Sequence, residues 1–263
     1  MRITMGLTGC VAVVTAVLAT TAPVRAVTNG QPDGNRHPYV GLAIQFIPDM
    51  PGFVTLCSGS ALSPTVFLTA AHCFDPELPV FVTYATAPPF DFAADFTAGA
   101  FHPHPDWCIE CGPGLPRFDT RDVAVIVLEA PRDPGAFAVL PPLGFVDTLR
   151  MRTSIDLVGY GVQGFERGGG PPQGIVTFIR FFAPSLLVKS NHVHSGEFIK
   201  LTANPGQGKG GTCFGDSGGP NIVSGTDTVI AVNSYVTNSN CAGVTYSNRI
   251  DIPEVLSFIV GFL

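Results

Sequence analysis

The feature that most constrains this chain is a succession of short β-rich segments separated by glycine and proline. The 263 residues include 30 glycines and 24 prolines, which favour turns and weaken long helices. β-Branched and aromatic residues concentrate in seven segments: 39–47, 65–70, 80–84, 123–128, 153–158, 175–182 and 229–235. This pattern predicts an antiparallel sandwich or barrel and argues against alternating strands and helices.

Only the C-terminus has a helical pattern. The segment 251–254 (DIPE) is a plausible helix start, and an apolar run continues to Leu263. The proline-rich stretch 131–142 is the best candidate for a boundary between two halves, about 27–140 and 141–250. The segment 168–172 (GGGPP) predicts an exposed loop or, alternatively, a linker.

The first 26 residues are typical of a secretory signal peptide. Arg2 precedes an apolar run at 11–18, and the segment 24–26 (VRA) offers a cleavage site before Val27. A membrane anchor is the alternative, but the run 6–22 has 17 residues (22 − 6 + 1) with four threonines and would span poorly. We therefore expect a secreted protein that has no membrane association after cleavage.

Charge and cysteine content agree with export. The formal net charge is -6, which argues against nucleic acid or anionic membranes as partners. Cys10 would leave with the signal peptide. The six other cysteines predict disulfides in an exported protein, although 15 pairings are open from the sequence alone: Cys57, Cys73, Cys108, Cys111, Cys213 and Cys241.

Three segments contain residues suited to nucleophilic catalysis. They are 68–73 (LTAAHC), 121–126 (RDVAVI) and 215–220 (GDSGGP). A serine between glycines in a tight loop is exposed and is approached closely by backbone N–H groups. Its hydroxyl needs a base such as an imidazole, and a carboxylate can hold that imidazole in the required tautomer.

The order His72, Asp122, Ser217 and these three segments resemble the signature regions of the chymotrypsin/trypsin-like serine peptidase family. Further similarity lies at 27–30 (VTNG), 104–107 (HPDW), 158–161 (VGYG) and 231–236 (AVNSYV). The resemblance covers nearly all of 27–263. It implies an all-β fold of two antiparallel Greek-key β-barrels packed face to face with a C-terminal helix, in a secreted, bacterial serine endopeptidase.

The resemblance also assigns roles to individual residues. Ser217 is the expected nucleophile, His72 its general base and Asp122 the carboxylate that orients the base. The N–H groups of Gly215 and Ser217 are expected to form the oxyanion hole. The Ser234 hydroxyl is expected to support Asp122.

Substrate specificity follows from the same resemblance. The backbone of Ser234, Tyr235 and Val236 is expected to pair with the substrate chain. Gly211, six residues before the nucleophile, corresponds to the pocket floor and offers no carboxylate for a basic side chain. Val236 and Gly243 correspond to the pocket walls, and an isopropyl group on one wall shortens the slot. The expected preference is for small to medium aliphatic residues before the scissile bond.

The predicted N-terminus suggests how the enzyme becomes active. In this family a free N-terminal ammonium pairs with the Asp before the nucleophile, which implies an ion pair between Val27 and Asp216. Ala26 stands where zymogens carry Arg or Lys, so signal cleavage alone should yield the active form. The alternative is that Val27 begins a flexible tail.

The resemblance implies two disulfides, Cys57–Cys73 and Cys213–Cys241. The remaining pair, Cys108–Cys111, has no equivalent in the family. A local disulfide is one reading, and a zinc site with His102, His104 and Asp106 is the other. We expect no metal or other cofactor, and we expect three histidines without a motif to lie on the surface: His37, His192 and His194.

Two other functions compete with a peptidase. One is a catalytically inactive binding protein on the same fold, since fold does not guarantee activity. The other is an esterase of the α/β-hydrolase type, but the triad order and the lack of βα alternation disagree with that fold. We expect a monomer that acts on protein or peptide substrates.

Overall fold

The computed structural model describes residues 26–48, 50–112, 118–166, 173–188, 196–204 and 209–263. Several predictions concern residues outside these ranges. They are the signal peptide up to residue 25, the segment 168–172 and the surface positions of His192 and His194.

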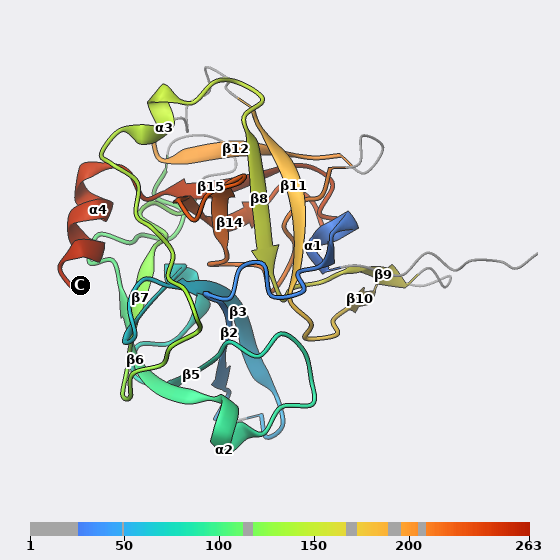
Figure 1. Ribbon diagram of the computed structural model, residues 1–263, viewed down its shortest axis with the longest axis vertical. Coiled ribbons are helices and arrows are strands. Elements are labelled where there is room, and N and C mark those ends of the chain that lie inside the picture. The colour runs from blue at the N-terminus through green and yellow to red at the C-terminus, as the bar shows by residue number, and fades with distance from the viewer. Residues whose placement is uncertain (1–25, 49, 113–117, 167–172, 189–195, 205–208) are drawn as a thin grey trace, which may run out of the picture.

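Six antiparallel strands close the first barrel (Figure 1). They are β2 (Val40–Phe46), β3 (Val54–Ala61), β4 (Val66–Thr69), β5 (Val80–Thr83), β6 (Thr97–Pro103) and β7 (Ala124–Leu128). The strands follow one another around the barrel in the order β2-β3-β4-β7-β6-β5, and β5 pairs back with β2.

The second barrel repeats this order. Its strands are β8 (Ser154–Gly159), β11 (Phe181–Val188), β12 (Phe198–Ala203), β13 (Pro220–Val223), β14 (Val229–Val236) and β15 (Gly243–Arg249). They run β8-β11-β12-β15-β14-β13, and β13 pairs with β8 to close the ring. Each barrel therefore has its strands in the Greek-key order one, two, three, six, five, four. The prediction of two antiparallel barrels is confirmed.

Short elements connect and flank the barrels. They are α1 (Ala26–Asn29), β1 (Gln31–Pro32), the 3₁₀ helix η1 (Ala71–Cys73), α2 (Phe92–Asp95), α3 (Phe145–Thr148), the hairpin β9 (Gly164–Glu166) and β10 (Gln173–Ile175), and α4 (Pro253–Val260). The element α1 is a turn and not a regular helix, because Val27 has a φ of 46°. None of the helices in the described ranges is long and apolar enough to cross a membrane.

Two segments that flank the barrels in the sequence each lie on the other barrel. β1 pairs with β11, so the segment before β2 lies on the second barrel and not on the first. The C-terminal helix α4 begins with Pro253, as predicted, and packs on the first barrel. There the His104 ring lies 4.9 Å from the Phe258 ring, and His104 Nε2 lies 3.4 Å from the Glu254 carbonyl. Each barrel is therefore contacted by a described segment that flanks the other barrel in the sequence.

Buried apolar side chains form three main clusters. One fills the first barrel around Phe67, and another fills the second around Leu201. The third spans the interface between the barrels and includes Leu68, Val232 and Val255 of α4. Burying a side chain of this size contributes about 1.5–3 kcal/mol, so the interface holds the two barrels in a fixed relation.

A buried ionic cluster crosses the same interface. Arg180 donates to Asp33 (3.0 Å) and to the Val40 carbonyl of the first barrel (2.7 Å). His37 Nδ1 lies 2.6 Å from Asp33. Burial opposes ionisation, but His37 and Arg180 together lower the pKa of Asp33. The predicted surface position of His37 is therefore wrong: its side chain is buried and hydrogen-bonds to a buried carboxylate.

Three disulfides join the six cysteines: Cys57–Cys73, Cys108–Cys111 and Cys213–Cys241. Cys57–Cys73 and Cys213–Cys241 are the two pairs that the resemblance implied. Cys108–Cys111 is the local disulfide that was one of the two interpretations of this pair. In the alternative zinc site, His102 and His104 would have been ligands. Instead the His102 ring lies 5.2 Å from Phe262, and His104 packs on α4.

Candidate active site

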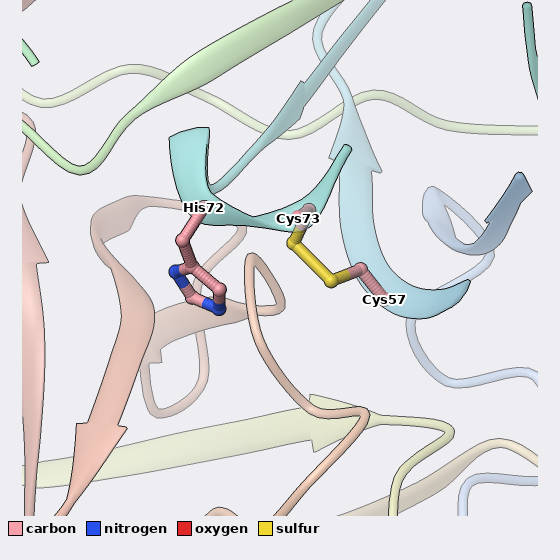
Figure 2. A group of neighbouring side chains, drawn as sticks. All are labelled: Cys57, His72 and Cys73. Atoms are coloured by element: carbon pink, nitrogen blue, oxygen red, sulfur yellow. A yellow bond between two sulfur atoms is a disulfide. The ribbon is translucent and has the colours of Figure 1, made fainter. Parts of the chain in front are cut away.

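His72 lies where the end of the first barrel meets the second. β4 ends at Thr69, and η1 turns the chain so that the imidazole leaves the barrel. The Cys57–Cys73 disulfide ties this turn to β3 (Figure 2). The histidine side chain keeps 31% of its surface exposed, so a substrate can reach it.

Asp122 lies just before β7 and is fully buried. One carboxylate oxygen accepts the His72 backbone N–H at 2.9 Å, and the other lies 2.8 Å from His72 Nδ1. The second oxygen also accepts a hydrogen bond from the Ser234 hydroxyl. The carboxylate thus joins His72 of the first barrel to β14 of the second.

This arrangement shifts the pKa of both partners. Burial favours protonated Asp122, but the charge and hydrogen bonds of His72, with the Ser234 hydroxyl, lower the pKa of the carboxyl. Burial likewise disfavours charged His72, but the carboxylate outweighs it and raises the pKa of the imidazole above 6.5. His72 Nδ1 faces the carboxylate, which leaves Nε2 for a reacting proton.

Ser217 lies in the tight loop between Cys213 and β13. Its carbonyl accepts the Ser58 N–H at 2.8 Å, which ties the loop to the first barrel. Gly218 has a φ of +75°, and a Cβ there would lie 2.6 Å from the Ala70 nitrogen and the Ser58 carbonyl. Only glycine fits this position, and its fit lets the loop approach His72.

Ser217 and His72 line the same pocket. Among the described residues, no hydrogen bond joins the Ser217 hydroxyl to His72. Catalytic hydrogen bonds are often long before substrate binds. The N–H groups of Gly215 and Ser217 also donate to no backbone acceptor in the described parts of the chain, so both donors are available to a ligand.

A pocket of about 230 Å³ opens beside these groups. The predicted substrate-binding residues Ser234, Tyr235 and Val236 line it. Its lining as a whole comes from both barrels and comprises His72, Thr212, Cys213, Phe214, Ser217, Asn233, Ser234, Tyr235 and Val236. No carboxylate is present among these residues.

The two glycines predicted as floor and wall lie outside this lining. Gly211 is buried, and its N–H donates to the Thr28 carbonyl at 3.2 Å. A Cβ at Gly211 would lie 3.1 Å from the Ala203 Cα. The backbone therefore needs glycine for packing, and Thr212 reaches the pocket in its place. Gly243 is exposed at the start of β15.

Asp216 is a second buried carboxylate. It accepts the N–H groups of Gly161 and Cys213, each at 2.9 Å. No cation pairs with it among the described residues, and burial raises its pKa to about 7 despite the two N–H groups. Val27 is buried in the second barrel, where α1 contacts β8, β9 and β11.

Cys57, His72 and Cys73 form the only group of His, Cys, Asp or Glu residues with ligand-like spacing found in the described ranges. Both sulfur atoms belong to one disulfide (Figure 2), whereas a metal requires thiolates. The grouping is therefore a disulfide beside the candidate base.

Four residues of the site were not predicted from the sequence. They are Ser58, Thr212, Phe214 and Asn233. The sequence offered one indication that these residues lie at the site: each is adjacent to a cysteine or to a predicted substrate-binding residue. Nothing in the sequence shows which way their side chains point.

These features define a two-barrel protein of the serine endopeptidase class. The family model described as Trypsin matches residues 32–259, and the chain belongs to that family. No curated protein sequence matches the chain significantly.

Solved structures share the fold at low sequence identity. HL collagenase is 20% identical with a TM-score of 0.64, and the match covers 85% of this chain and 94% of that one. Human heparin binding protein is 16% identical with a TM-score of 0.64, covering 89% and 95%. A protein described as GrC is 18% identical with a TM-score of 0.67, covering 88% and 97%. At such identities the similarity shows the fold alone.

The pKa of His72 provides a test of the site geometry. We expect the imidazole to titrate in NMR with a midpoint above 6.5, because the Asp122 carboxylate stabilises its cation. Asp122→Asn should lower the midpoint, because it removes the negative charge that stabilises the imidazolium. An unchanged midpoint in Asp122→Asn would show that the two side chains do not interact.

Proposed function

We propose that this protein is a secreted endopeptidase that cleaves peptide bonds through an acyl-enzyme on Ser217. The observation that carries the proposal is the hydrogen-bonded set of His72, Asp122 and Ser234 beside a pocket that also holds Ser217. Two unpaired N–H groups in the same loop add the means to bind an oxyanion.

The reaction follows from these positions. His72 Nε2 removes the hydroxyl proton as Ser217 Oγ attacks the carbonyl carbon, and Asp122 stabilises the resulting imidazolium. The negative oxygen binds to the N–H groups of Gly215 and Ser217. The imidazolium then protonates the leaving amine. Water, activated by the same imidazole, hydrolyses the ester and restores Ser217.

Replacement of the nucleophile tests this proposal. Ser217→Ala should lower kcat on a protein substrate by about 10⁶, leaving the modest catalysis that binding alone supplies. Phenylmethylsulfonyl fluoride should label Ser217 in the wild type. Ser257→Ala, in an exposed position of α4, is the matched control and should keep full activity. Wild-type turnover by Ser217→Ala would refute the assignment.

The pocket favours small to medium aliphatic side chains. Its lining contains no carboxylate to pair with Arg or Lys, and the Val236 isopropyl group is part of that lining. Asn233 and Thr212 add polar groups, but the amide of Asn233 is occupied by other hydrogen bonds. We retain the preference inferred for aliphatic residues, now with Thr212 in the place assigned to Gly211.

A panel of chromogenic peptides tests this preference. Peptides with Ala, Val or Leu before the scissile bond should exceed those with Arg or Lys in kcat/KM by at least about tenfold, since a buried cation would remain unpaired. Val236→Gly should widen the pocket and improve aromatic substrates relative to the wild type. Basic substrates that are cleaved best by the wild type would contradict the proposal.

We further propose that removal of residues 1–26 creates the active form. The ionised form of a carboxyl whose pKa rises from 3.8 to about 7 is disfavoured by about 4 kcal/mol. A new ammonium at Val27 would neutralise Asp216 and order the loop that holds Gly215 and Ser217. The burial of Val27 in the second barrel supports this path.

The stability of the two forms should depend differently on pH. In the unprocessed chain, folded Asp216 binds its proton more tightly than unfolded Asp216. The free energy of unfolding should therefore fall as pH rises from about 4 to 7. In a chain beginning at Val27 this decline should disappear. A chain with one extra residue before Val27 should behave like the unprocessed form and lose kcat/KM; wild-type kcat/KM in that chain would exclude the ion pair.

A further inference from the structure

The peptide group between Asp216 and Ser217 is held in place by a hydrogen bond from a side chain outside its own loop. The Asp216 carbonyl accepts two hydrogen bonds, one from Asn233 Nδ2 at 2.9 Å and one from the Gly219 N–H at 2.9 Å. In a trans peptide the C=O and N–H point in opposite directions within one plane. Fixing the Asp216 carbonyl on Asn233 therefore fixes the direction of the Ser217 N–H, which points away from Asn233.

Asn233 is itself fixed on every side. Its Oδ1 accepts Asn221 Nδ2 at 2.6 Å and the Ser247 hydroxyl at 3.3 Å, so Nδ2 is the atom that faces Asp216. Its backbone N–H donates to the Gly219 carbonyl at 2.9 Å, and its carbonyl accepts the Gly218 N–H at 2.8 Å. The residue is 2% exposed, so water does not compete for these bonds.

Neighbouring peptides of the loop are held in a similar way. The Phe214 carbonyl accepts the Val162 N–H at 2.8 Å, which fixes the plane that contains the Gly215 N–H. The Gly215 carbonyl accepts the Ser58 hydroxyl at 2.9 Å. The peptide that contains the Ser217 N–H differs from the one that contains the Gly215 N–H in the group that holds its carbonyl. The Asp216 carbonyl accepts a hydrogen bond from the Asn233 side chain, whereas the Phe214 carbonyl accepts one from a backbone N–H. A substitution of Asn233 can therefore remove this hydrogen bond without changing any residue of the loop.

We infer that Asn233 is a positioning residue of the oxyanion hole: its amide aims and polarises the Ser217 N–H toward the oxygen that becomes negative. The inference rests on the proposed function, because it needs Ser217 as nucleophile. A hydrogen bond accepted by the carbonyl of a peptide strengthens donation by its N–H. Donors held in advance toward a developing charge act mainly on the transition state.

Asn233 also lines the pocket, so a change there can alter substrate binding without any effect on the oxyanion. Two matched inhibitors separate these effects. A peptide trifluoromethyl ketone forms a hemiketal oxyanion with Ser217, whereas the corresponding alcohol fills the same pocket and forms none. The peptide sequence is the same in both, so only the ketone reports on the N–H donors.

The experiment compares Ki for the two inhibitors in the wild type, Asn233→Leu and Asn233→Ala. In both variants we expect Ki of the ketone to rise by about 10- to 100-fold with a similar fall in kcat, while Ki of the alcohol changes less than about threefold. Ser257→Ala, the exposed control in α4, should bind both inhibitors as the wild type does.

Each other outcome overturns a distinct claim. A wild type that binds ketone and alcohol equally refutes Ser217 as nucleophile, and with it the inference. Variants that weaken both inhibitors equally, or neither, refute the role of Asn233 alone. If neither variant folds, the scalar coupling across the bond from Asn233 Nδ2 to the Asp216 carbonyl is measured in the wild type. It should strengthen when the ketone adduct forms, and an unchanged coupling refutes the inference.

Discussion

The candidate site depends on one buried carboxylate, Asp122, whose charge is compensated from both barrels. His72 comes from the first barrel and Ser234 from the second, and each contacts a carboxylate oxygen. A buried charge that lost these partners would destabilise the fold by several kcal/mol. The same contacts hold the imidazole and β14 together, so the groups that keep the interface stable also set the geometry of the proposed reaction.

The loop that holds Ser217 depends in turn on polar groups from elements far away in the sequence. Ser58 of β3 holds the Ser217 and Gly215 carbonyls, and Asn233 of β14 holds the Asp216 carbonyl. Close approach is possible because Gly218 has no Cβ. The loop is thus shaped by its surroundings, and its own sequence supplies the reactive hydroxyl and the freedom to turn.

The sequence predicted six of the twelve barrel strands that the structure describes, and it missed or misplaced the others. β2, β4, β5, β7, β8 and β14 were expected within a residue or two, and α4 began as expected. β3, with Cys-Ser-Gly-Ser inside it, and β15, with Thr-Tyr-Ser-Asn, lack a continuous apolar run. β6, β12 and β13 were also not predicted. The run 175–182 was wrong as a single strand, since β10 ends at Ile175 and β11 begins at Phe181.

The sequence by itself determined the all-β class, two of the three disulfide pairs through their likeness to a family, and the chemical identities of His72, Asp122 and Ser217. Local patterns carry such information because a strand, a glycine turn or a reactive side chain is a property of a few adjacent residues. Only the tertiary structure decided that His37 is buried, that Thr212 and not Gly211 meets the pocket, and that the Asn233 amide faces the Asp216 carbonyl. Each of these features depends on which residues, distant in the sequence, the folded barrels bring into contact. The sequence pattern does not show which way these side chains point.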